Sequence, residues 1–197
     1  MRHKYLGEWL PASWPEMEAT LWAIGRLMRQ LHEATASFVP PQNAVWMPWA
    51  LHERDGDVIS HCNIAPWNVR FRSSHSLGFV NWEYAGPTSR LHEVAVTGWY
   101  SAHLHDDDVA EREGLPEAET RIHWLKSFLD GYRLPRSERR GLVTRMIEFA
   151  VRDTAGFARS RKITPESKAP EPLWLMAWQI RAADCLLRHR AQTEASL

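Results

Sequence analysis

The sequence predicts a mainly α-helical protein with a small β-hairpin, forming a single domain over residues 1–197. Apolar residues recur at helical spacing in five segments of the chain. Three short apolar runs near the middle have the length of strands. A length of 197 residues corresponds to roughly one domain and is enough to bury a core without disulfides or metals.

The first helix is predicted over residues 16–35. Its apolar residues fall three or four positions apart and so lie on one face, at Met17, Leu21, Ile24, Met28 and Leu31. Two prolines at 40 and 41 cannot continue a helix. Residues 42–57 therefore read as a loop.

Short strands are predicted at 58–60, 69–72 and 77–80, with residues 73–76 joining the last two as a hairpin. So few short strands are not stable alone and need a helical body to pack on. Residues 84–90 read as a loop because they contain Gly86 and Pro87. Helices are predicted at 91–102, 117–133, 137–161 and 171–191, with a polar, acidic loop between the first two.

Composition excludes several classes of function. Lys and Arg number 24 and Asp and Glu also number 24, so the formal net charge is zero. Nucleic-acid binding proteins need a basic excess, so we expect no nucleic acid partner. No apolar run approaches the roughly 18 residues of a membrane span, and no signal peptide is visible. Cys62 and Cys185 lie far apart, as in proteins of a reducing compartment, and we expect a cytoplasmic protein.

Two polar segments carry the chemistry that the sequence suggests. Residues 61–68 read HCNIAPWN and place His61, Asn63 and Asn68 in one loop. Asn81 and Glu83 lie in a second segment, which follows a short apolar strand. Polar loops at the ends of adjacent β-segments are typical of sites that hold a phosphate and a metal ion.

These motifs resemble the aminoglycoside phosphotransferase and choline kinase family. In that family a His, Asp and Asn loop is followed by an apolar strand ending in Asp-Trp-Glu. The segments LMRQLH at 27–32, FVNWEYAGP at 79–87 and LHEVA at 91–95 match the family pattern in order. The resemblance covers about residues 20–105 and implies the C-terminal lobe of a kinase-like fold. We expect the N-terminal β-lobe to be absent, because only 60 residues precede His61 and they contain no Gly-rich loop.

Within this family, the segments APWN at 65–68 and AGP at 85–87 are similar to a bacterial branch described as trifolitoxin-immunity-like. That resemblance implies protection against an antibacterial peptide.

The same resemblance indicates a degenerate catalytic site. It places Asn63 at the position of the catalytic Asp, and an amide cannot accept a proton; losing a general base costs about 10²–10⁴-fold in rate. It places Asn68, Asn81 and Glu83 at metal positions, although Mg²⁺ prefers charged oxygens. His61 would orient the loop. We therefore expect a protein that acts by binding, without a cofactor.

Two alternatives remain open from the sequence. One is an active ATP-dependent phosphotransferase that uses Mg²⁺ and ATP to phosphorylate a small molecule. The other is a regulatory subunit that docks on another kinase-like chain.

The ligand cleft is predicted to include Trp67, His103, His105 and Asp106. Two histidines separated by one residue and followed by carboxylates can bind Zn²⁺, although no distant third ligand is evident. The other interpretations are an ordinary acidic loop and a contact surface for a cationic ligand.

The partners expected are an antibacterial peptide or its target. A protein partner could instead cover the apolar surface left by the missing lobe, near Trp46, Met47, Trp49 and Trp67. A homodimer through the same surface is a further alternative.

Overall fold

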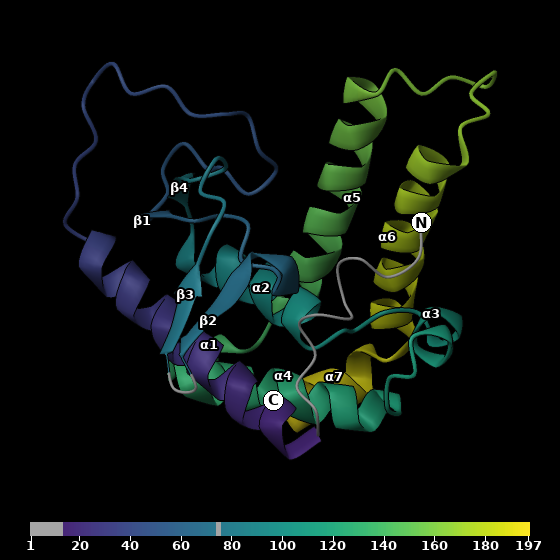
Figure 1. The fold of residues 1–197 in the computed structure, drawn as a ribbon, viewed down its shortest axis with the longest axis horizontal. Helices are drawn as coiled ribbons and strands as arrows, with labels where there is room; N and C mark the ends of the chain where they lie inside the picture. Colours follow the sequence, from purple (N-terminus) through teal and green to yellow (C-terminus); the bar gives the residue numbers. More distant parts are fainter. Residues whose placement is uncertain (1–13, 74–75) are drawn as a thin grey trace.

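The computed structural model describes residues 14–73 and 76–197, and within them the protein is mainly helical (Figure 1). The elements are, in order, α1 (Trp14–Thr35), β1 (Val58–Ser60), β2 (Val69–Ser73), β3 (Ser76–Phe79), β4 (Gly86–Thr88), α2 (Arg90–Ser101), α3 (Asp107–Arg112), α4 (Ala118–Tyr132), α5 (Leu142–Ser160), α6 (Pro170–Arg188) and α7 (Arg190–Ser196). Short 3₁₀ turns occupy Pro66–Asn68 and Arg136–Glu138. The prediction of a mainly α protein with a small β-hairpin is confirmed, and a second small antiparallel sheet is present.

Helices α1 and α4 pack against each other at unusually close range. A Cβ atom at Gly25 would lie 2.1 Å from the carbonyl oxygen of Phe128, and one at Gly131 would lie 2.0 Å from that of Trp22. Glycine permits this close approach, because any side chain at these two positions would push against the backbone of the facing helix. The close approach buries the apolar face predicted for α1, including Met17, which is fully buried.

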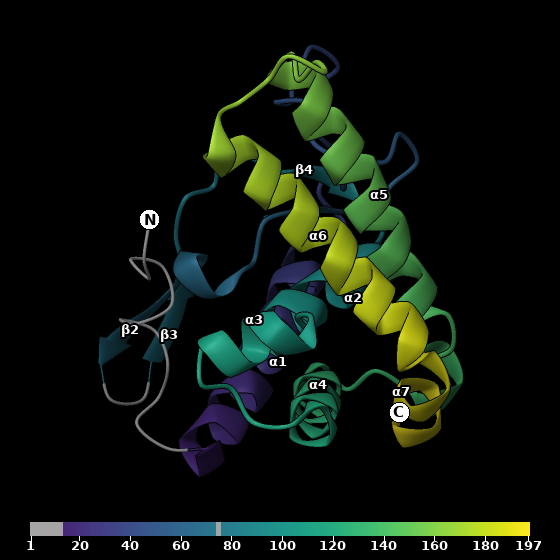
Figure 2. The same ribbon diagram turned by 90° about the vertical axis from the view of Figure 1, so that its right-hand side faces the viewer.

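Helix α2 runs through the centre of the molecule and contacts both α4 and α5. Helices α5 and α6 lie side by side, as Figure 2 shows, and α7 returns to contact α4. The largest fully buried side chains are aromatic and come from α2, α4 and α5: Trp99, Trp124, Phe128, Tyr132 and Phe149. The core is therefore built between the central helix and the helices around it.

Two small antiparallel sheets lie beside this helical body. The hairpin predicted from residues 69–80 is formed by β2 and β3, with Val69 opposite Phe79. Strand β1 pairs with β4, whose Gly86 lies opposite Ser60. The sequence did not predict β4, because Gly and Pro indicate a loop; Pro87 is tolerated in this two-stranded sheet, where each strand has a free edge.

The acidic segment after α2 contains a helix where the sequence predicted only a loop. In α3, Asp107 and Asp108 occupy the first turn, where the helix dipole favours negative charge, and Arg112 donates to Asp108 at 3.1 Å. Val109 and Ala110 are buried.

The predicted helix at 171–191 is broken at His189, which ends α6 and precedes α7.

None of the helices in the described residues is both long enough and apolar enough to cross a membrane.

Candidate functional site

The two polar segments found in the sequence lie next to each other. The loop at 61–68 follows β1 and the segment at 80–84 follows β3. The backbone N–H of Val80 donates to the carbonyl of Asn68 at 3.0 Å. The ring Nε2 of His61 lies 2.9 Å from the carbonyl oxygen of Val80. Both bonds connect one loop to the other.

The three asparagines form a chain of hydrogen bonds. The side-chain Nδ2 of Asn68 donates to the carbonyl of Asn63 at 2.8 Å, and the Nδ2 of Asn81 donates to the Oδ1 of Asn68, also at 2.8 Å. Asn81 has a φ of 64°, a left-handed conformation that asparagine adopts more readily than most residues. Asn63 enters this chain through its backbone. The network is neutral throughout.

His61 holds the loop through both ring nitrogens. Its Nδ1 accepts the backbone N–H of Asn63 at 3.2 Å, so Nε2 carries the proton that bonds Val80. Burial lowers the pKa of His61, although the bond to Val80 acts in the opposite direction. The ring is therefore neutral and fixed, which is the geometry that an orienting histidine requires.

Trp82 packs against His61 with its ring tilted by 57° and forms the exposed edge of the site. The two ring centroids lie 4.6 Å apart. The indole N–H donates to the carbonyl of Phe79 at 3.1 Å, and the side chain remains 45% exposed. Sequence reasoning did not include Trp82 in the site, although it lies between Asn81 and Glu83, which are both exposed.

A buried acid supports the start of the loop. The backbone N–H of Cys62 donates to Glu93 of α2 at 2.6 Å, and His32 of α1 donates to the same carboxylate at 2.8 Å. The hydroxyl of Tyr132 in α4 lies 2.7 Å from the other nitrogen of His32. Burial alone would raise the pKa of Glu93, but these hydrogen bonds hold it below its ordinary value. Three helices thereby fix the loop.

The residues that could hold a metal here are Asn68, Asn81 and Glu83. Two of them are neutral amides already bonded to each other. Glu83 carries the one carboxylate among these three residues and lies exposed in the segment between β3 and β4.

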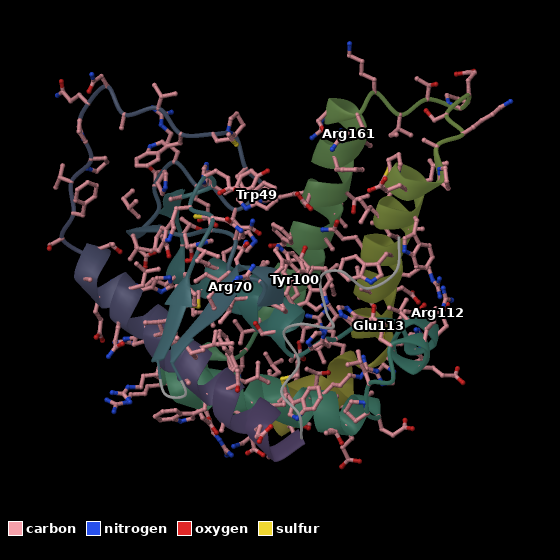
Figure 3. All side chains as sticks on the ribbon, in the orientation of Figure 1. Trp49, Arg70, Tyr100, Arg112, Glu113 and Arg161 are labelled. Carbon is pink, nitrogen blue, oxygen red and sulfur yellow. The ribbon has the colours of Figure 1, made fainter. Side chains whose placement is uncertain are left out.

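Trp67 and the histidines predicted to share the cleft are separated by a row of aromatic rings. Trp67 contacts Tyr100 at 5.6 Å between centroids, Tyr100 stacks on Trp178 at 6.3 Å, and Trp178 lies 5.0 Å from His105. Tyr100 occupies the middle of the molecule (Figure 3). His103 and His105 are buried. Whether they contact a ligand stays a prediction.

The carboxylates of the acidic loop are paired with arginines of this chain, and contact with a cationic ligand stays a prediction. Asp106 accepts hydrogen bonds from Arg181 and Arg188 of α6. Asp107 accepts from Arg188 at 3.2 Å. Asp108 is bonded by Arg181 as well as by Arg112. Arginines of this chain already neutralise these acids.

A separate cleft of about 550 Å³ lies between α5 and the residues before β1 and at the start of α2. Arg54, Arg145 and Arg152 line it together with Glu53, Asp55 and Glu148. Opposite charges are balanced in this lining, so it does not favour ligands of one sign. No motif in the sequence pointed to it.

Comparison with known proteins identifies a relative that matches nearly the whole chain. The trifolitoxin immunity protein of Rhizobium leguminosarum bv. trifolii is 42% identical over 193 residues, which cover 97% of this chain and 71% of the relative. No family model matches the chain. No solved structure matches it either, so the kinase-like lobe stays a prediction. An identity of 42% over this length shows that the chain belongs to the trifolitoxin immunity protein family.

Proposed function

We propose that this protein protects a bacterial cell against an antibacterial peptide of the trifolitoxin kind, and that it acts by binding the peptide rather than by phosphoryl transfer. The observation that carries the proposal is the 42% identity to a protein named for trifolitoxin immunity. The geometry of the site bears on how the protection works.

The chemistry of the asparagine network does not fit Mg²⁺ and ATP. The Oδ1 of Asn68, the atom through which an asparagine ligates a metal, already accepts a hydrogen bond from Asn81. Mg²⁺ prefers charged oxygens in octahedral geometry, and Glu83 alone supplies a charge here. Asn63 offers an amide where a phosphotransferase needs a base. These features support a site that holds two loops in place and does not turn over a nucleotide.

The exposed rim of the site suits a peptide. Asn81 and Glu83 offer groups that can hydrogen-bond a peptide backbone, and Trp82 between them offers a large apolar face. The indole is already oriented by His61 and by its bond to Phe79. A side chain fixed before binding loses little entropy when the ligand arrives.

The test compares two tryptophans of equal exposure. Trp82 is 45% exposed at the site, and Trp22 is 43% exposed on α1. A peptide-sensitive bacterium expresses the natural chain, Trp82→Ala or Trp22→Ala, and the inhibitory concentration of trifolitoxin is measured. We expect the natural chain and Trp22→Ala to protect, and Trp82→Ala to lose at least about tenfold, because truncating a central aromatic contact costs roughly 2 kcal/mol or more.

The same assay includes Asn63→Asp, which restores the carboxylate of the kinase-like pattern and leaves the backbone hydrogen bonds of residue 63 in place. Protection by this variant should equal that of the natural chain. Failure of the natural chain to protect, or equal losses in Trp82→Ala and Trp22→Ala, would refute the proposal. Melting curves and cellular protein levels of each variant separate loss of binding from loss of folding.

A further inference from the structure

The turn between α2 and α3 brings together three side chains that commonly ligate metals. One nitrogen each of His103 and His105 and one carboxylate oxygen of Glu113 all lie within 4.8 Å of one another. Glu113 follows the last turn of α3 and lies beside that helix in Figure 3. The sequence did not point to Glu113, because it lies eight residues beyond His105 and carries no motif.

We propose that His103, His105 and Glu113 form a binding site for a divalent transition metal ion of the zinc class, separate from the asparagine site. Two imidazoles and one carboxylate are a common donor set for zinc. Nitrogen ligands select zinc, cobalt, nickel or copper over magnesium and calcium, which require oxygen.

Hydrogen bonds hold the backbone of this turn in place. His103 has a φ of 51°, and its carbonyl accepts the N–H of His105 at 2.7 Å. One nitrogen of Arg121 donates to the carbonyls of both histidines, at 2.9 Å each. Ligands held by a rigid backbone lose little freedom when a metal binds.

The two histidines are buried, and one ring nitrogen of His105 is open to a ligand. His103 is fully buried and His105 is 4% exposed. The Nδ1 of His105 has no hydrogen-bond partner among the described residues, and a buried polar nitrogen normally has one.

The guanidinium of Arg121 repels a cation at this site, and two carboxylates oppose that effect. Asp107 lies 3.7 Å from Arg121. Glu113 brings its own negative charge to the ligand set. Tetrahedral zinc ligands lie roughly 3.4 Å apart, so the three ligand atoms would have to approach one another by up to about 1.4 Å.

A neighbouring group, Asp107, Cys185 and His189, also places its ligand atoms within 4.8 Å of one another. We favour the first group for two reasons. Asp107 is already bonded by Arg188. The Sγ of Cys185 already donates to the backbone carbonyl of His105 at 3.4 Å.

The experiment titrates the full chain, first stripped with a chelator, with Zn²⁺ in competition with a chromogenic chelator. We expect one Zn²⁺ per chain. Affinity should fall at least about tenfold in His105→Ala and in Glu113→Gln, because each variant removes one ligand. His123→Ala, which removes an exposed histidine of α4, and Cys185→Ser should bind as the natural chain does. Mg²⁺ should not compete.

Thermal melting gives a second readout that does not depend on the competitor. Zn²⁺ should raise the melting temperature of the natural chain and of His123→Ala but not of Glu113→Gln, whose substituted side chain is half-buried rather than in the core. Absence of saturable binding at 100-fold excess Zn²⁺, unchanged affinity in His105→Ala, or loss of binding in Cys185→Ser would each overturn the proposal.

Discussion

Glu93 connects the asparagine site to the core by two hydrogen bonds, one from the loop and one from α1. Its carboxylate has no solvent exposure and accepts from the backbone of Cys62 and from His32. A buried carboxylate stays charged only when such partners replace the lost water. Removing the charge therefore affects both the stability of the protein and the position of the loop.

Glu93→Gln should destabilise the protein by about 3 kcal/mol near pH 7, because one partner of a buried pair is lost. Glu18→Gln is the matched control: Glu18 lies 3.2 Å from His123, but both side chains are about half exposed. An exposed pair contributes little, so this variant should lose at most about 0.5 kcal/mol. Urea unfolding measures the free energy of unfolding of both variants.

The cost of Glu93→Gln should depend on pH. The folded-state pKa of Glu93 is lowered, so its contribution is complete above the ordinary glutamate value of about 4.3 and is lost as pH falls through the folded-state pKa. The difference in unfolding free energy between the natural chain and the variant should therefore shrink in acid. A difference that stays constant from pH 7 to pH 3 contradicts this account of the pair.

At the scale of elements, the contact between α1 and α4 depends on two glycines. Gly25→Ala places a methyl group against the carbonyl of Phe128 and should destabilise the protein by about 1–3 kcal/mol. Gly156 lies in α5 with no atom within 4 Å of a Cβ built there, and Gly156→Ala should stabilise by about 0.5–1 kcal/mol through helix propensity. Thermal unfolding distinguishes the two variants by the sign of the change in melting temperature. Equal changes of the same sign would show that α1 and α4 can separate without a loss of stability.

The elements differ in how far the sequence could predict them. The helices α1, α2 and α4 were predicted within two residues because apolar periodicity and flanking prolines act locally. Strand β4 escaped prediction, since its Gly and Pro are strand residues only because β1 pairs with them. Helix α3 escaped because its acids are stabilised partly by arginines of α6.

At the scale of the whole molecule, contacts between distant segments hold the asparagine site and the acidic loop in place. Asn68 and Asn81 meet because the β2–β3 hairpin returns the chain, and that turn was predicted from the sequence. Glu93 and His32 are hydrogen-bonded although 61 positions separate them in the sequence. Arg181 and Asp106 are bonded across a separation of 75 positions. No local sequence pattern predicts such pairs. For the same reason the sequence did not predict that His103 and His105 are buried.

Protection by binding the peptide without a nucleotide, as proposed above, can be measured directly. The most direct measurement is a calorimetric titration of the purified chain with trifolitoxin, first alone and then with Mg²⁺ and ATP present. The account predicts saturable binding of one peptide per chain, with an affinity that Mg²⁺ and ATP leave unchanged. Binding that requires ATP, phosphate found on the peptide, or no binding at all would contradict it.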